Sequence, residues 1–314
     1  MKALYYDGKL EIKEIEKPTP PPGEALVKVT LAGICATDRE IAAGYMNFRG
    51  VPGHEFVGIV EQSGDPDLLG KRVVGEINCA CGDCEMCRKC LERHCPHRTV
   101  LGIQGRNGAL AEYLLLPNRN LKVVSAILDD RQAVFSEPLA AALEISEQIK
   151  LEPGARTLII GDGKLACLIA QALRLQGLEL AVSGKNAEKL GLIQSWGIPV
   201  LEDDPHPAFY DLVIEASGSP SGWTTAVTSV KPRGTIVLKS TYQGSLEFNP
   251  APLVVNEITL VGSRCGRLEP ALRLLEAGLI DVDSLIDVVY QFDDVLDAFE
   301  YASRPEAMKV LVEF

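Results

Sequence analysis

The hydrophobic pattern of the chain changes character near residue 150. Before that point, apolar and polar residues alternate over 10–16, and 25–31 and 55–61 are further short stretches typical of strands, with glycine and proline between them. Alternation with a period of two predicts β-strands that are buried on one face. Short strands joined by long, irregular loops are typical of a barrel-like β domain, which we expect in the first half of the chain.

Beyond residue 150, continuous apolar runs take turns with helical periodicity. The run at 156–160 predicts a buried parallel strand, and apolar residues at a spacing of three and four predict a helix over 164–176. The pattern then predicts strands at 178–182, 211–216, 235–239 and 258–261, with a second helix over 187–196. This alternation predicts a parallel sheet with helices on both faces. A helix over 293–303 and a strand over 308–314 complete the prediction.

Length and charge narrow the classes of function. A chain of 314 residues with 46% hydrophobic and 24% charged residues is expected to fold into two domains. Its net charge of −12 makes nucleic acids and anionic membranes poor partners. No stretch approaches the roughly 20 apolar residues that span a bilayer. Charged residues follow the first methionine too early for a secretory signal, so we expect a cytoplasmic protein.

The cysteines are concentrated in one short segment. Six of the nine lie within 79–95. Four thiolates on a compact loop can surround one zinc ion tetrahedrally, and such a closed site is structural. Free buried thiols and an iron–sulfur cluster are the alternatives, although the spacing departs from ferredoxin runs. The pattern C-x2-C-x2-C-x7-C is formed by Cys81, Cys84, Cys87 and Cys95. Cys79 and Cys90 are surplus, and each can replace a ligand or stay free.

A glycine-rich turn follows the strand predicted at 156–160. Residues 161–166 read G-x-G-x-x-A, directly between a strand and a helix. In a dinucleotide-binding turn, Gly161 permits the tight bend and Gly163 lets the backbone approach the pyrophosphate at the helix N-terminus. Asp162, Lys164 and Leu165 complete this predicted cofactor site. A glycine-rich turn without a ligand is the alternative.

The end of the strand at 178–182 bears on the choice of cofactor. NAD-binding folds usually carry an acidic residue there, which holds the ribose 2′-hydroxyl. This chain has none at 181–186. Ser183 can donate a hydrogen bond to a 2′-phosphate and Lys185 can neutralise it, so the sequence favours NADP(H) over NAD(H). If Lys185 is an ordinary exposed lysine, NAD(H) remains the alternative.

Three separated segments carry further metal-ligating residues. Cys35 lies in Gly-Ile-Cys-Ala-Thr-Asp, His54 in Gly-His-Glu, and Glu137 in Ser-Glu-Pro. Each segment alone is a weak signal. Together with the four-cysteine segment and the glycine turn, they resemble the zinc-dependent medium-chain alcohol dehydrogenase superfamily. The branch of sorbitol and threonine dehydrogenases is most similar, and the resemblance extends over nearly the whole chain.

The resemblance implies a fold and a metal site. The fold is α/β, with a GroES-like β-barrel catalytic domain over 1–147, to which 288–314 return, and a Rossmann domain over 148–287. The catalytic zinc is bound by Cys35, His54 and Glu137, which leaves an open coordination position. Glu55 lies beside this metal. With the four-cysteine site, the resemblance implies two zinc ions per chain.

The resemblance also implies a reaction, in which hydride passes between an alcohol or polyol and NAD(P). Thr37 accepts the alcohol proton, and Ser217 lines the cofactor site. Glu40 stands where many relatives carry a histidine that relays the proton outward, and a residue that only begins a solvent-facing helical turn is the equal alternative. A quinone reductase-like relative without catalytic zinc and a non-enzymatic zinc-binding module are the other interpretations. We expect a homodimer or homotetramer that binds a small-molecule substrate.

Overall fold

The computed structural model describes residues 1–241 and 249–314. The chain forms two compact units: unit 1 comprises Met1–Glu137 and Arg267–Phe314, and unit 2 comprises Pro138–Gly266. The boundaries expected from the sequence, 147/148 and 287/288, lie later in the chain than these. The first differs because helix α4 (Ser136–Gln148) begins in unit 1 and continues into unit 2. Helix α9 (Leu268–Glu276), which the sequence analysis left out, accounts for part of the second difference, since it belongs to unit 1.

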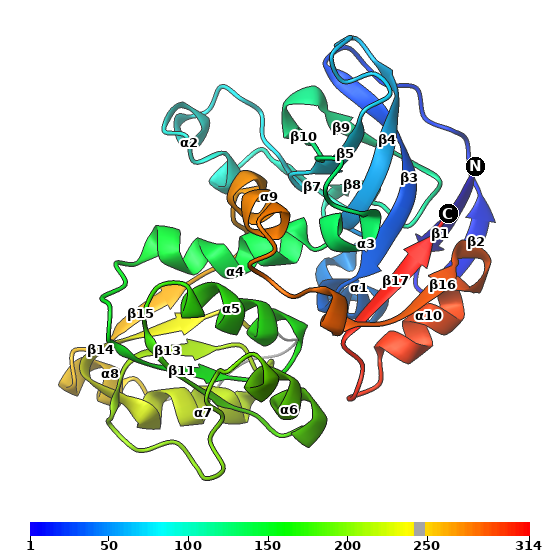
Figure 1. Ribbon diagram of the computed structural model, residues 1–314. Helices are drawn as coiled ribbons and strands as arrows, with labels where there is room; N and C mark the ends of the chain where they lie inside the picture. Colours follow the sequence, from blue (N-terminus) through cyan, green and yellow to red (C-terminus); the bar gives the residue numbers. More distant parts are fainter. Residues whose placement is uncertain (242–248) are drawn as a thin grey trace. The chain divides into compact units, whose positions relative to one another are not determined.

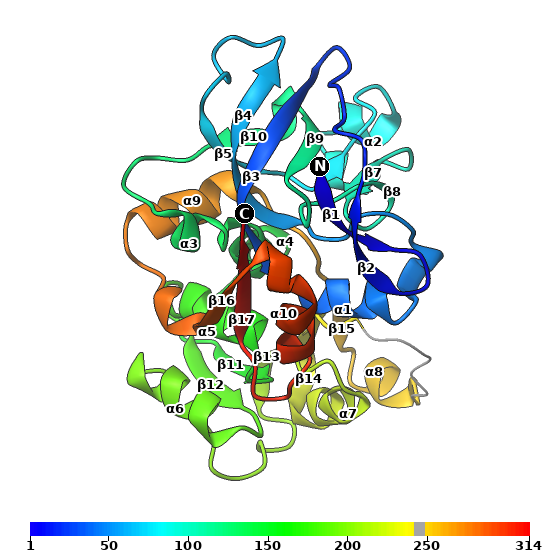
Figure 2. The same cartoon turned by 90° about the vertical axis from the view of Figure 1, so that its right-hand side faces the viewer.

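Unit 1 is built on a seven-stranded sheet with the order β10-β5-β4-β3-β17-β16, in which β9 also pairs with β3. The pairs that β3 makes with β4, β9 and β17 are antiparallel, whereas β16 and β17 are parallel. Figure 2 shows β17 alongside β3, with the C-terminus at its end. The strands are β3 (Glu24–Ile34), β4 (Glu55–Ser63), β5 (Arg72–Gly75), β9 (Tyr113–Pro117), β10 (Leu121–Val123), β16 (Ile286–Gln291) and β17 (Lys309–Glu313).

The pattern of burial along β3 determines how deeply the residue that follows the strand is buried. In its middle, from Val27 to Leu31, the strand alternates between buried and more exposed residues, but Leu31–Ile34 are all buried. Register shifts against β4 near Val29 interrupt the ladder just before this buried end. The strand therefore ends in the interior of unit 1, and Cys35, which follows it, is partly buried.

Smaller elements complete unit 1. Strands β1 (Lys2–Tyr6) and β2 (Leu10–Glu14) form an antiparallel hairpin. A three-stranded sheet contains β6 (Asn78–Cys79), β7 (Thr99–Leu101) and β8 (Gly105–Arg106). The remaining helices are α1 (Ala36–Ala42), α2 (Glu85–Arg88), α3 (Asp130–Ala133) and α10 (Val295–Ala302), with 3-10 turns at Tyr45–Asn47, Glu92–His94, Asn118–Asn120, Asp283–Leu285 and Phe292–Asp294.

Unit 2 contains a five-stranded parallel sheet with the order β12-β11-β13-β14-β15. Helices α5 and α7 lie on opposite faces of this sheet (Figure 1), which confirms the predicted parallel, doubly covered sheet. The strands are β11 (Arg156–Ile160), β12 (Glu179–Ser183), β13 (Tyr210–Glu215), β14 (Val230–Leu238) and β15 (Thr259–Gly262). The helices are α5 (Lys164–Arg174), α6 (Ala187–Ser195), α7 (Pro220–Ser229) and α8 (Ala251–Val255).

Strand β14 begins earlier than the apolar pattern predicts. It starts at Val230, ahead of a polar segment that contains Arg233 with a φ of 62°, and its register with β13 shifts there. An irregular strand start of this kind leaves no apolar periodicity in the sequence. No helix among residues 1–241 and 249–314 is long and apolar enough to cross a membrane.

Candidate zinc and dinucleotide sites

The four predicted thiols of the cysteine-rich loop lie together in unit 1. Cys84 Sγ is 3.4 Å from Cys87 Sγ and 3.7 Å from Cys95 Sγ, and Cys81 Sγ is 3.5 Å from Cys95 Sγ and 3.9 Å from Cys87 Sγ. A tetrahedral zinc ion with Zn–S bonds of about 2.3 Å requires sulfur–sulfur separations of about 3.8 Å. The donor set therefore fits one zinc ion without rearrangement.

Short local elements shape this loop. Cys84 is the N-cap of α2, a helix of only four residues, and Gly82 has a φ of +90°, which a side chain would strain. The guanidinium of Arg119 donates a hydrogen bond to the carbonyl oxygen of Ala80 and so ties the start of the loop to the turn before β10.

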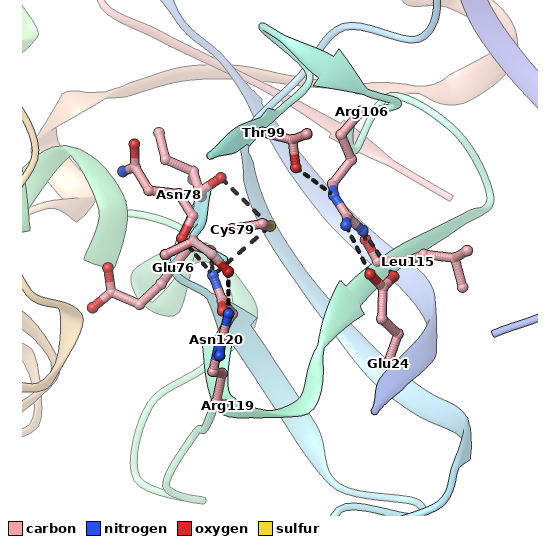
Figure 3. A network of polar contacts seen from close by, with 11 residues as sticks. Glu24, Glu76, Asn78, Cys79, Thr99, Arg106, Leu115, Arg119 and Asn120 are labelled. Atoms are coloured by element: carbon pink, nitrogen blue, oxygen red, sulfur yellow. Dashed lines mark hydrogen bonds and ion pairs between the residues drawn. The ribbon is translucent and has the colours of Figure 1, made fainter. Parts of the chain in front are cut away.

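The two surplus cysteines lie outside the four-sulfur group. Cys79 is buried on β6, where its sulfur is 3.9 Å from Nδ2 of Asn120 and 3.9 Å from the carbonyl oxygen of Ile77 (Figure 3). Burial raises the pKa of the Cys79 thiol above its ordinary value. Cys90 is exposed. Neither residue belongs to the group whose ligand atoms approach one another within 4.8 Å.

A second group of candidate ligands forms where β3 ends and β4 begins. Cys35 Sγ, a ring nitrogen of His54 and a carboxylate oxygen of Glu55 all lie within 4.8 Å of one another. Cys35 follows β3 as the N-cap of α1, and Glu55 opens β4 opposite Gly33. A Cβ atom on Gly33 would lie 2.4 Å from Glu55 Oε2, so a glycine is required for this close approach.

Asp38 holds the first two ligands in place, a role that its sequence segment alone does not predict. Its Oδ2 accepts a hydrogen bond of 2.8 Å from the amide of Cys35, and its Oδ1 accepts one of 3.0 Å from the amide of Gly53. His54 Nδ1 lies 3.2 Å from Oδ1. Burial opposes ionisation, yet His54 and the two amides hold the pKa of Asp38 below its ordinary value. This close approach orients the imidazole, as an outer-shell carboxylate does at a metal-binding histidine.

Glu55 is paired with a residue from the far end of the sequence. Its Oε2 accepts a hydrogen bond from Lys309 Nζ on β17, and both side chains are fully buried. The other oxygen, Oε1, is buried and has no hydrogen-bond partner among the described residues. The site therefore combines thiolate, imidazole and carboxylate donors, and one oxygen of the carboxylate is buried without a hydrogen bond from the described part of the chain. This combination suits zinc. The sequence around Lys309 does not predict its pairing with Glu55.

The remaining predicted residues of this site lie close by. Glu137 stands in the first turn of α4. Desolvation raises the pKa of its carboxyl to about 7; the nearby charge of His54 opposes this rise and that of Glu55 adds to it. Glu137 is not in the group formed by Cys35, His54 and Glu55. Thr37 Oγ1 is 3.9 Å from Cys35 Sγ, and Glu40 lies further along α1, partly exposed.

The glycine turn of unit 2 connects β11 to α5, as the sequence predicts. Gly161 has a φ of +126°, and a Cβ there would lie 2.6 Å from the carbonyl oxygen of Ala216. Gly163 is the N-cap of α5, and a Cβ there would enter open space. That space at a helix N-terminus fits a pyrophosphate group. Lys164 and Leu165 form the first turn of α5.

The other predicted cofactor residues surround this turn. Ser183 ends β12, and the side chain of Lys185 is exposed. Asp162, between the two glycines, accepts hydrogen bonds at Oδ2 from the amides of Lys185, at 2.5 Å, and Asn186, at 2.8 Å. Ser217, just after β13, donates a hydrogen bond of 2.5 Å to the carboxylate of Glu215.

Comparison with known proteins agrees with this arrangement. Residues 21–126 match the family model of the alcohol dehydrogenase GroES-like domain, and residues 164–277 match that of the zinc-binding dehydrogenases. Together the two matches cover well over half of the chain. They define an oxidoreductase of the zinc-binding dehydrogenase class, with a GroES-like and a Rossmann part. The chain belongs to the zinc-type medium-chain alcohol dehydrogenase superfamily, as its motifs predict.

Individual relatives match along the full length. A sorbitol dehydrogenase from Halalkalibacterium halodurans is 26% identical over 99% of this chain and 98% of the relative. A protein from Sinorhizobium meliloti 1021, described as a zinc-binding dehydrogenase and solved with NADP, is 28% identical with a TM-score of 0.90, over 100% of this chain and 99% of that chain. An alcohol dehydrogenase from Escherichia coli CFT073, solved with NADH, is 27% identical with a TM-score of 0.91 over the same shares.

Proposed function

We propose that this protein is a zinc-dependent dehydrogenase that transfers hydride between an alcohol or polyol and a nicotinamide cofactor. The observation that carries the proposal is the cluster of Cys35, His54 and Glu55, whose ligand atoms lie within 4.8 Å of one another, together with the buried Oε1 of Glu55, which has no hydrogen-bond partner among the described residues. The same chain contains a dinucleotide turn with open space at Gly163. The sorbitol dehydrogenase relative supports a polyol as the substrate class.

We assign two zinc ions to each chain. The thiolates of Cys81, Cys84, Cys87 and Cys95 would hold the structural ion. Cys35, His54 and Glu137 would hold the catalytic ion, with Glu55 kept beside it by its bond to Lys309. When bound, a catalytic zinc acts as a Lewis acid toward the substrate oxygen.

Side chains near Cys35 would transfer the proton that the substrate hydroxyl loses. Thr37, whose hydroxyl lies near Cys35, is proposed to accept the proton from the substrate hydroxyl. Glu40, on the same helix and partly exposed, is proposed to pass it toward solvent. Asp38 keeps the imidazole of His54 in its orientation and does not itself react.

The nicotinamide cofactor is supported by relatives solved with NADP and with NADH. The prediction of NADP(H) from the sequence rests on Ser183 and Lys185, and it stays a prediction. The carboxylate of Asp162, which is bonded to the amides of Lys185 and Asn186, weighs against it.

Two alternative functions are a reductase without catalytic zinc and a non-enzymatic zinc-binding module. The first does not require the buried donors around His54, and the second does not require a dinucleotide-binding turn. A cytoplasmic location is proposed as well, because closely spaced thiols such as Cys81 and Cys84 serve as metal ligands in a reducing compartment rather than as disulfides. A homodimer or homotetramer is proposed from the superfamily resemblance alone.

The test is a polyol panel assayed for reduction of NAD⁺ and NADP⁺ at 340 nm, with zinc measured by mass spectrometry. We expect activity with at least one polyol. Glu137→Gln should lose at least 100-fold in kcat/KM, because a neutral amide is a weaker ligand than a carboxylate. Glu147→Gln, at an exposed position on the same helix, serves as the control and should retain activity. A folded wild-type protein that oxidises no alcohol would contradict the proposal, as would an active Glu137→Gln variant.

A further inference from the structure

The end of β12 has an unusual composition for a dinucleotide-binding fold. The residues there are Ser183, Gly184 and Lys185, so the strand supplies no carboxylate of its own. In such folds an acidic residue at this place usually holds the ribose 2′-hydroxyl. The structure nevertheless places a carboxylate there, from Asp162 in the glycine turn after the neighbouring strand β11.

Two backbone amides fix the position of this carboxylate. Asp162 Oδ2 accepts hydrogen bonds from the amide of Lys185 at 2.5 Å and from that of Asn186 at 2.8 Å. Asn186 is in turn the N-cap of α6, its side chain accepting hydrogen bonds from the amides of Glu188 and Lys189. The carboxylate is therefore anchored to a loop that is itself held at a helix start.

Gly184 shows that the carboxylate replaces a side chain of the strand end. A Cβ atom on Gly184 would lie 2.6 Å from Asp162 Oδ2, 2.7 Å from Asp162 Cβ and 2.9 Å from Leu190 Cδ2, the last being the movable end of a leucine side chain. The Asp162 side chain thus fills the volume that a side chain at 184 would occupy. An acidic residue at 184 and an aspartate at 162 exclude each other sterically, so the chain has room for one carboxylate here.

The hydrogen bonding leaves part of the carboxylate available. Both amide bonds go to Oδ2, and among the described residues Oδ1 accepts no hydrogen bond. Oδ1 can therefore accept a hydrogen bond from a ribose hydroxyl.

We propose that Asp162 determines the choice of cofactor and selects NAD(H) over NADP(H); this rests on the proposed function of unit 2 as the nucleotide-binding part of a dehydrogenase. A 2′-phosphate would meet a negative charge at this position. It would also find the amides of Lys185 and Asn186 already occupied by Oδ2. The exposed side chain of Lys185 does not remove either obstacle.

Binding of each nucleotide, measured by isothermal titration calorimetry without substrate, tests the proposal. Wild-type protein should bind NAD⁺ more tightly than NADP⁺. Asp162→Asn keeps an oxygen for the two amides but loses the charge, and it should shift the ratio of dissociation constants about 10-fold or more toward NADP⁺. Asp203→Asn, an exposed aspartate in the same unit, is the control and should leave the ratio unchanged.

A swap of positions distinguishes the carboxylate from a general effect on the loop. Asp162→Gly combined with Gly184→Asp returns the acid to the strand end, and it should restore the preference for NAD⁺ that Asp162→Gly alone loses. Equal or tighter binding of NADP⁺ by the wild type, an unchanged ratio in Asp162→Asn, or no binding of either nucleotide would overturn the proposal. A chain that selects NAD⁺ but oxidises no alcohol would refute the proposed reaction and leave the role of Asp162 intact.

Discussion

Replacing Lys309 with methionine perturbs the most deeply buried charge pair of unit 1. Lys309 and Glu55 are both fully buried, and Lys309 Nζ also lies 5.2 Å from the centre of the Phe135 ring. Two unit charges about 4 Å apart interact by about 4 kcal/mol at an effective dielectric constant of 20. Removal of one partner from a buried pair costs about 3–5 kcal/mol, because the other charge is left without compensation. We therefore expect Lys309→Met to lower the free energy of unfolding of unit 1 by about 3–5 kcal/mol.

Hydrogen exchange measured by mass spectrometry gives the local free energy of opening. Peptides from β3, β4 and β17 should lose protection in the variant, whereas those from β11 and β13 in unit 2 provide the internal reference. The double variant Lys309→Met/Glu55→Gln should recover part of the loss, because it no longer buries an unpaired carboxylate. A cost below about 1 kcal/mol, the value of an exposed ion pair, would refute the reasoning.

Two further predictions concern the cysteine loop and the glycine turn. Cys84→Ser should lower the zinc content by one ion per chain, whereas Cys90→Ser should leave it unchanged, since only Cys84 belongs to the four-sulfur group; equal losses in both variants would contradict this assignment. Gly161→Ala should destabilise unit 2 by about 1–3 kcal/mol in thermal unfolding, because its φ is +126° and its Cβ would meet the Ala216 carbonyl. Gly163→Ala should fold normally but bind nucleotide more weakly, because its Cβ projects into the open space at the start of α5; unimpaired binding would place the pyrophosphate elsewhere.

Much of the architecture is predictable from local patterns. The buried strands of unit 2 leave continuous apolar runs, and the thiols of the cysteine-rich loop are close in sequence as well as in space. Periodicity and spacing capture such features because every residue involved belongs to one short segment. The boundary between the two units lies within helix α4 and could not be predicted, because no feature of the helix sequence marks where unit 1 ends and unit 2 begins.

The contacts that the sequence could not predict join distant segments. Glu55 and Lys309 pair across 254 positions, and a lysine in the last strand carries no local sign that it is buried. The sequence shows a glycine at 184 and an aspartate at 162, far apart in the chain. Only the structure shows that these two positions are in steric contact, so that Asp162 takes the place of an acidic residue at 184. For this reason the sequence favoured NADP(H), whereas the structure supports a proposal of NAD(H).

The zinc content of purified wild-type protein and of Cys35→Ser, measured together with polyol-dependent reduction of the cofactor, tests whether Cys35 binds a catalytic zinc ion. We expect two zinc ions per wild-type chain. We expect one in Cys35→Ser, with the cysteine loop still loaded and the reaction lost. A variant that retains both zinc ions, or that loses one and still reduces the cofactor at the wild-type rate, would contradict this expectation.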